Sequence, residues 1–345
     1  MSAPRSLESG QSAATEGGDA NTLLSVQYLR AAAALAVTIY HALQWEDGGF
    51  EVGRAGVDVF FVISGLIMWR VTAGHRMSPG AFLARRASRV VPLYWVMTLT
   101  VFGLALVWRG FLPEVLSGLG HLALSLAFIP HLDPLGRPFP TLPPGWTLTY
   151  EAIFYLLFAV ALWLPRRLRA TAVTVGLCLV VAAGFVLTDP VYTLGANPMM
   201  LQFAAGVWLG VALEAGALPS GIWCAVMLTM GVLWFVVLEA AGLLNELWRP
   251  LLWGVPAVLI VGGALSLEAR RGMFRSPSLK ALGDASYALY LVHLPATALV
   301  AHTLGWRNPW LFLPAALALS LGAALACHRW VERPLIALFR GANPR

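Results

Sequence analysis

The sequence predicts an all-α membrane protein: a polytopic helix bundle of about ten transmembrane helices, with one further helix that is re-entrant or half-buried. Only 12% of the 345 residues are charged and 59% are hydrophobic, whereas a soluble domain carries about 25% charged residues. Mean hydropathy is +0.73, and apolar segments follow one another from residue 23 with short connections. At about 20 residues for each span, the chain has room for ten or eleven crossings and for no large domain outside the membrane.

The apolar segments follow a polar start. Residues 1–22 are rich in Ser, Gly, Ala and acidic residues without apolar periodicity, which predicts a disordered cytoplasmic tail. They lack the basic region, short apolar core and cleavage site of a signal peptide. We interpret 23–336 as one membrane domain and 337–345 as a second cytoplasmic tail. The apolar segments lie at 23–45, 55–72, 90–108, 115–131, 146–164, 170–188, 198–214, 217–238, 250–267, 284–302 and 308–328.

Positive charge is concentrated in four connections. Lys and Arg total 23, for a net charge of +6, and Lys280 is the only Lys. Sixteen of these residues lie in 70–89, 165–169, 268–280 and the tail from Arg329, against five in the other connections. Because cytoplasmic loops carry the excess of Lys and Arg, these four connections are predicted to lie in the cytoplasm. An excess that faces anionic lipid also explains the basic composition without a nucleic-acid partner.

The four basic connections share one side only if one segment between Arg89 and Arg166 does not cross. The best candidate is 115–131, which is short, contains two Gly and two His, and runs into a Pro-rich loop. We therefore predict ten crossings, both termini in the cytoplasm, and 115–131 as the re-entrant or half-buried helix. If 115–131 crossed, every later connection would change sides and the charge bias would vanish.

The three cysteines, Cys178, Cys224 and Cys327, lie inside or at the ends of apolar segments. An odd number without paired loop positions argues against a disulfide framework and against a zinc site. They are interpreted as small packing residues.

Charged and imidazole side chains inside the spans are few, and each is a candidate for function, because a charge costs roughly 2.5–3.5 kcal/mol there even on lenient insertion scales. The first segment holds Arg30 and, eleven residues later, His41. Eleven residues rise about 16 Å over almost three turns, so both side chains face nearly the same direction at different depths. They could line a passage. Alternatively, Arg30 extends to lipid phosphate and His41 lies at the interface.

Two carboxylates lie near the expected depth of His41. Glu151 falls in the first turns of 146–164, and an imidazole beside a carboxylate can act as a general base with its orienting partner. Alternatively, Glu151 stabilises a helix start capped by Thr147 or Thr149. Asp58, in the second segment, is interpreted either as part of the site or as a partner for a backbone group or an Arg.

Arginines precede the third segment, in the string FLARRASRVVPLYW. Arg86 and Arg89 are three apart and therefore share one helix face, while Arg85 lies beside them. Guanidinium groups suit phosphates, although the same residues could serve as ordinary cytoplasmic anchors.

Motifs of several common chemistries are absent from the sequence. It contains no phosphate-binding GxxxxGK[ST] loop, no HExxH and no GxSxG. Ser64 therefore lacks the context of a nucleophile, and the Ser64–Gly65 pair instead predicts close helix packing.

Taken together, the strings QYLRAAAALAVTIYH, AGVDVFFVISGLIMW, FLARRASRVVPLYW, WTLTYEAIFY, LGDASYALYLVHLP and WVERPL resemble the acyltransferase 3 family in their order across residues 25–336. Within that family the resemblance is greatest to bacterial exopolysaccharide O-acetyltransferases. It implies an enzyme of the bacterial inner membrane that moves an acyl group, commonly acetyl from cytoplasmic acetyl-CoA, onto a hydroxyl of a sugar or related acceptor. Acetyl-CoA would be a co-substrate, and no bound cofactor or metal is expected.

The resemblance also assigns residues. The Arg-x10-His motif of the family falls on Arg30 and His41, and its paired arginines fall on Arg86 and Arg89. Its Trp…Glu motif falls on Trp146 and Glu151, with Thr147 and Thr149 as a mild departure from the family pattern.

These assignments imply a separate role for each group of residues. His41 and Glu151 would be catalytic, by direct transfer or through an acyl-His intermediate, and Arg30, Arg86 and Arg89 would hold acyl-CoA. The residues interpreted as site walls are Asp58, Ser64, Tyr94, Trp146, Tyr150, Tyr155 and His293. Some relatives carry a soluble esterase-like domain, for which this chain has no room.

Alternative functions stay open at this point. A transporter or flippase for a polysaccharide or a lipid-linked sugar is the second interpretation, and a scaffold in a polysaccharide complex is the third. The partners expected of the enzyme are acyl-CoA, a carbohydrate or glycolipid acceptor and the lipid bilayer, and a homo-oligomer is left open.

Overall fold

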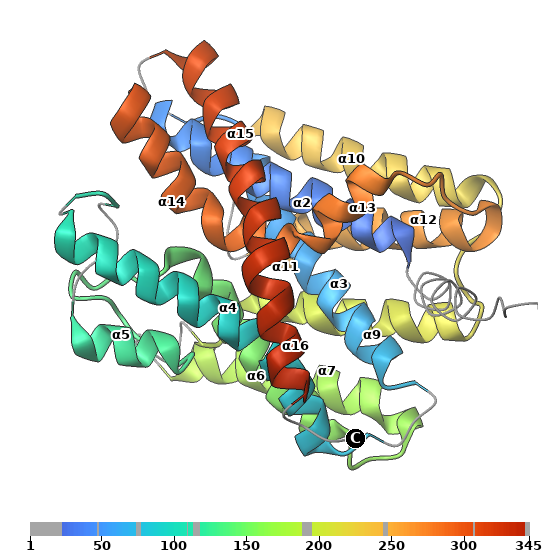
Figure 1. The fold of residues 1–345 in the computed structure, drawn as a ribbon. Helices are drawn as coiled ribbons and strands as arrows, with labels where there is room; N and C mark the ends of the chain where they lie inside the picture. Colours follow the sequence, from blue (N-terminus) through green and yellow to red (C-terminus); the bar gives the residue numbers. More distant parts are fainter. Residues whose placement is uncertain are drawn as a thin grey trace, which may run out of the picture.

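A computed structural model describes residues 23–46, 48–73, 77–108, 110–112, 118–187, 195–243, 248–305 and 308–341. Over these ranges the chain is built from helices and turns, without a strand (Figure 1). The predicted tail 1–22 lies outside the described residues, as does the end of the second predicted tail, 342–345.

Ten long helices account for most of the described chain. They are α2 (Leu24–Leu43), α3 (Ala55–Val71), α4 (Pro79–Val107), α6 (Trp146–Ala161), α7 (Arg166–Val186), α9 (Leu201–Glu214), α10 (Ile222–Ala241), α12 (Gly254–Arg271), α14 (Ser286–Leu304) and α15 (Pro309–Cys327). Short helices join or extend them: α5 (Leu119–Leu126), α11 (Arg249–Leu252), α13 (Pro277–Asp284) and α16 (Arg333–Gly341). The predicted all-α class is confirmed.

Seven helical segments in the described chain are long and apolar enough to cross a membrane, which makes this a multi-pass membrane protein. They contain α3, α4, α7, α10, α12, α14 and the continuous run of α15 into α16. The other long helices, α2, α6 and α9, do not meet the same criterion of length and apolarity. The number of ten crossings therefore stays a prediction.

Helix α5 occupies part of the segment predicted to be half-buried, 115–131. Its eight residues rise about 12 Å, well short of the roughly 30 Å apolar core of a bilayer. Residues 113–117 lie outside the described chain, so the re-entrant path also stays a prediction.

The C-terminal helix is longer than the apolar pattern predicts. Instead of ending near residue 328, α15 continues through a π-helical turn, His328–Glu332, into α16 and ends at Gly341. Figure 1 shows this run as one red column that crosses the whole molecule. The apolar period alone misplaces the end, because α16 is amphipathic and its polar residues resemble a tail.

Helices α3 and α9 cross at very close range through two glycines. A Cβ on Gly65 would lie 2.0 Å from the carbonyl oxygen of Phe203, and a Cβ on Gly206 would lie 2.0 Å from that of Val62. Only a residue without a side chain permits this approach. The close packing predicted for the Ser64–Gly65 pair is confirmed, and it fixes the part of α3 that faces the site.

Candidate active site

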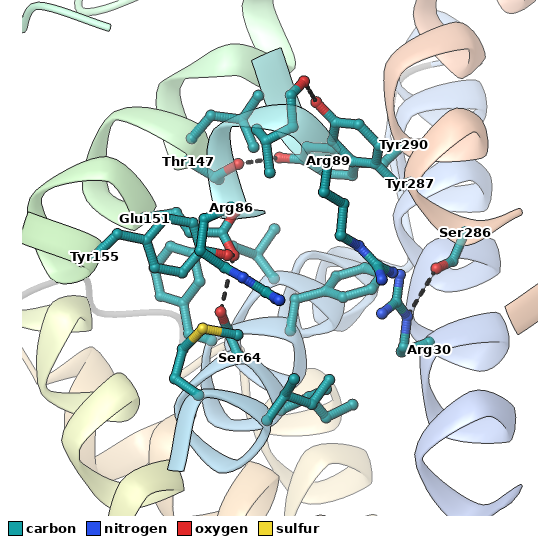
Figure 2. A pocket seen from close by; sticks show the side chains of 18 residues that line it. Arg30, Ser64, Arg86, Arg89, Thr147, Glu151, Tyr155, Ser286, Tyr287 and Tyr290 are labelled. Atoms are coloured by element: carbon teal, nitrogen blue, oxygen red, sulfur yellow. Dashed lines mark hydrogen bonds between the residues drawn. The ribbon is translucent and has the colours of Figure 1, made fainter. Parts of the chain in front are cut away.

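A pocket of about 120 Å³ lies where α2, α3, α4, α6 and α14 meet. Among the residues predicted for the site, it is lined by Arg30, Ser64, Arg86, Arg89, Glu151 and Tyr155 (Figure 2). Side chains from five helices, spread between residues 30 and 290, therefore converge on one cavity.

Three arginines define the charge of this pocket. Arg86 and Arg89 come from one face of α4, as their spacing predicts, and Arg30 comes from α2. The Nε–H of Arg30 donates to the Ser286 hydroxyl over 3.1 Å. Figure 2 shows the guanidinium groups of Arg30 and Arg89 side by side, with that of Arg86 extending into the pocket. Three cations against one carboxylate give the lining an affinity for anions.

Glu151 is held by two hydroxyl groups. Ser64 on α3 donates to Oε1 over 2.8 Å, and Tyr155, one turn along α6, donates to the same oxygen over 2.5 Å. The start of α6 has no side-chain cap: Gly145 occupies the N-cap position, and the Thr147 hydroxyl donates to the Pro144 carbonyl. Glu151 therefore lines the pocket and does not cap the start of α6.

Thr147 and Tyr290 line the pocket and are joined by a hydrogen bond of 3.0 Å between their hydroxyl groups. The ring of Tyr290 lies 5.9 Å from that of His293, measured between centroids. His293 Nε2 lies 3.2 Å from His41 Nδ1. The two histidines thus form a pair next to the pocket, beyond Tyr290, and neither is among its lining residues.

The predicted pairing of His41 with Glu151 is not seen among the described contacts. His41 contacts the Val37 carbonyl and His293, whereas Glu151 contacts Ser64 and Tyr155. A similar depth does not bring the two side chains together, because α2 turns His41 toward α14 and α6 turns Glu151 toward α3.

Asp58 has a structural partner. It is fully buried and forms an ion pair of 2.8 Å with Arg249, and Gln202 also donates to its carboxylate. The alternative that Asp58 pairs with an Arg is confirmed, and the residue does not line the pocket.

The remaining predicted wall residues lie elsewhere. The hydroxyl of Tyr94 donates to the Ser125 carbonyl over 3.1 Å. Trp146 and Tyr150 pack edge to face and border a separate small cavity near His131. Of the seven predicted wall residues, the pocket therefore uses Ser64 and Tyr155.

Sequence reasoning missed three lining residues on α14: Ser286, Tyr287 and Tyr290. The signal was available, because a spacing of four places Ser286 and Tyr290 on one helix face, and their hydroxyls contact Arg30 and Thr147. Within the described residues, no group of three or more His, Cys, Asp or Glu side chains is gathered as a metal centre would require.

A sequence model described as an acyltransferase domain, of the acyltransferase 3 type, matches residues 23–329. The chain belongs to the acyltransferase 3 family. This acyltransferase 3 protein is 37% identical over 306 residues to the exopolysaccharide production protein ExoZ of Rhizobium meliloti (strain 1021), across 86% of the chain and 94% of that protein. The matched region contains every residue of the pocket, so the family resemblance and the geometry refer to the same part of the molecule.

Two further relatives have names that state an acyl transfer. The peptidoglycan O-acetyltransferase OatA of Listeria monocytogenes is 27% identical over 90% of the chain, which spans only 55% of that protein. The acyltransferase MdmB of Streptomyces mycarofaciens is 27% identical over 93% of the chain and 94% of its own length. No solved structure matches this acyltransferase 3 protein.

Proposed function

We propose that this membrane acyltransferase transfers an acetyl or other short acyl group from cytoplasmic acyl-CoA to a hydroxyl of a glycan or related acceptor. The observation that carries the proposal is the convergence of Arg30, Arg86 and Arg89 on one pocket inside a helix bundle. The three guanidinium groups outnumber Glu151, the carboxylate in the same lining, so the charge of the pocket favours an anionic ligand. The phosphates of acyl-CoA are anions for which guanidinium forks are well suited.

The charge pattern supports a cytoplasmic side of the membrane for the pocket. Arg86 and Arg89 lie near the start of α4, directly after the basic connection predicted to be cytoplasmic. Ten crossings with both termini in the cytoplasm would place this end of α4 on the cytoplasmic side of a bacterial inner membrane, where acyl-CoA is available. Of the ten long helices in the described residues, seven lie in segments that are long and apolar enough to cross a membrane, and this topology needs α2, α6 and α9 to cross as well.

Glu151 belongs to the donor side of the site in this proposal. Its carboxylate balances part of the arginine charge, and the hydroxyls of Ser64 and Tyr155 hold it in place. This role replaces the orientation of His41 that its depth suggested.

His41 is the proposed reactive base. Its ring takes the proton of the acceptor hydroxyl as the hydroxyl oxygen attacks the thioester carbonyl carbon. The new C–O bond forms, the C–S bond breaks, and the departing CoA thiolate recovers the proton from His41. In the alternative route, the same ring nitrogen first accepts the acyl group and then passes it to the hydroxyl.

The acceptor class comes from the relatives. ExoZ is named for exopolysaccharide production and OatA for peptidoglycan O-acetylation. A glycan hydroxyl is therefore the proposed acceptor. Comparing the acyl-ester content of surface glycans with and without the gene tests this part of the proposal.

The donor site is tested by arginine substitutions on one helix. Membranes that contain the protein are given labelled acetyl-CoA, and label in the glycan fraction is measured. Arg86→Gln and Arg89→Gln are each expected to raise KM for acetyl-CoA at least about tenfold, the effect of losing one charge-assisted hydrogen bond. Arg85→Gln is the matched control, because Arg85 is exposed on the same helix and does not line the pocket. Equal effects of all three substitutions would contradict the assigned donor site.

A further inference from the structure

His41 and His293 share a contact at one end of the seam between α2 and α14. His41 Nδ1 lies 2.9 Å from the Val37 carbonyl oxygen and 3.2 Å from His293 Nε2. His293 Nδ1 lies 3.3 Å from the Leu289 carbonyl oxygen. His293 is fully buried, whereas His41 is partly exposed.

The two carbonyl groups determine where the ring protons lie. A carbonyl oxygen only accepts hydrogen bonds, so a ring nitrogen that faces one must carry a proton. Nδ1 of His41 faces Val37 and Nδ1 of His293 faces Leu289, so both neutral rings are protonated at Nδ1.

This assignment makes the contact between the rings favourable. His293 Nε2 then holds a lone pair and accepts a hydrogen bond from Nδ1–H of His41, which this N–H shares with the Val37 carbonyl. His41 Nε2 is left with a lone pair of its own, on the ring that is partly exposed. If His293 were instead protonated at Nε2, two N–H groups would point at each other.

We propose that His293 is the positioning residue for His41: together with the Val37 carbonyl it holds the ring in the tautomer whose Nε2 is basic, and it accepts a stronger hydrogen bond when that nitrogen takes a proton. A buried neutral imidazole thus fills the place that a carboxylate occupies in many catalytic pairs. The inference rests on the proposed function, and it applies to direct transfer and to an acyl-His intermediate alike, because Nε2 of His41 reacts in both.

Two substitutions of similar size separate positioning from packing. In His293→Gln, the longer side chain can place an amide oxygen where Nε2 stands, so it can still accept from His41. In His293→Asn, the shorter side chain reaches the position of Nδ1 only. His302→Leu is the matched control, because His302 lies on the same helix and contacts the Phe111 carbonyl instead of another histidine.

The assay is transfer of labelled acetyl from acetyl-CoA, with kcat and KM determined separately for each variant. His293→Asn is expected to lower kcat about 10- to 100-fold, as for the loss of a hydrogen bond to a charged group, with KM for acetyl-CoA changed less than about twofold. His293→Gln is expected to keep at least about a third of kcat, and His302→Leu to match the unsubstituted protein.

The outcomes distinguish this inference from the proposed function. If His41→Ala abolishes transfer while His293→Asn keeps full kcat, the positioning role is wrong and the acyltransferase proposal stands. Equal loss in the Gln and Asn variants would also overturn positioning, because it would show packing. Full turnover in His41→Ala would overturn the role of His41 itself, and the inference with it.

Discussion

Loss of the Asp58 carboxylate is expected to destabilise the fold strongly. Asp58 is 0% exposed and its partner Arg249 is 3% exposed. Arg249 donates from Nη2 to Oδ2 over 2.8 Å and from Nε to Oδ1 over 3.2 Å, and Gln202 donates to Oδ1 as well. Asp58→Asn keeps the shape of the side chain and removes the carboxylate that pairs with this buried guanidinium.

The expected cost follows from this burial. Removing one partner of a buried ion pair costs about 3–5 kcal/mol, because the remaining charge stays desolvated. At roughly 2 °C per kcal/mol for a chain of this size, Tm falls by about 6–10 °C. Thermal unfolding of the purified protein in detergent, followed by intrinsic fluorescence, measures the shift.

An exposed pair supplies the control. Lys280 and Asp284 lie 3.7 Å apart, with side chains 34% and 37% exposed. Asp284→Asn makes the same chemical change where water screens the charge, so it is expected to cost less than about 1 kcal/mol. An Asp58→Asn variant whose Tm falls no further than that of Asp284→Asn would refute the reasoning. A double variant, Asp58→Leu with Arg249→Met, is expected to be more stable than Asp58→Asn, because neither charge of this pair is left buried.

Three further perturbations test other parts of the structure. Gly65→Ala is expected to cost about 3 kcal/mol by overpacking against α9, whereas Gly103→Ala, where an added Cβ meets nothing within 4 Å, is expected to leave Tm unchanged or higher. Tyr155→Phe removes a 2.5 Å hydrogen bond to the pocket carboxylate and is expected to lower kcat/KM about tenfold, measured by labelled acetyl transfer. Burial raises the pKa of Asp133, but hydrogen bonds from the backbone and guanidinium of Arg137 outweigh it and hold that pKa below its ordinary value. At neutral pH the backbone around Asp133 is therefore expected to be more protected from hydrogen exchange in the unsubstituted protein than in Asp133→Asn. This difference in protection is expected to vanish as pH falls below about 4.

The arginines and Glu151 were predictable from sequence because charge is scarce in apolar segments. Arg30, Arg86, Arg89 and Glu151 stand out against long apolar runs, and all of them line the same pocket. The spacing of Arg30 and His41 also predicts a shared face, and both contact α14, through Ser286 and His293. The spacing of residues along one helix therefore predicts which side chains face the same neighbouring helix.

The partners across helices were not predictable in the same way. The depth expected from the sequence placed Glu151 level with His41 in the membrane. Depth alone does not determine how a helix is rotated about its axis. That rotation is set by packing between helices, including the glycine contact that brings α3 close to α9 and the ion pair between Asp58 and Arg249. The α14 tyrosines escaped notice for a related reason: in an apolar segment a tyrosine fits a packing role equally well.

The contact between α2 and α14 suggests how the proposed phosphate-binding residue and the proposed base are kept apart. Arg30 and Ser286 meet at one end, and His41 and His293 meet eleven and seven residues further along the same two helices. Eleven residues place Arg30, proposed to bind phosphate, about 16 Å along the helix axis from His41, the proposed base. The Tyr290–Thr147 hydrogen bond lies between the pocket and the histidines. A donor anchored by its phosphates would reach His41 only through an extended arm that carries the acyl group at its end and passes Tyr290. Acyl-CoA has such an arm, whereas acetyl phosphate does not, so acetyl phosphate is expected to fail as a donor even where it binds the arginines. Label transfer from acetyl phosphate at a rate comparable to that from acetyl-CoA would show that the distance between Arg30 and His41 does not select the donor.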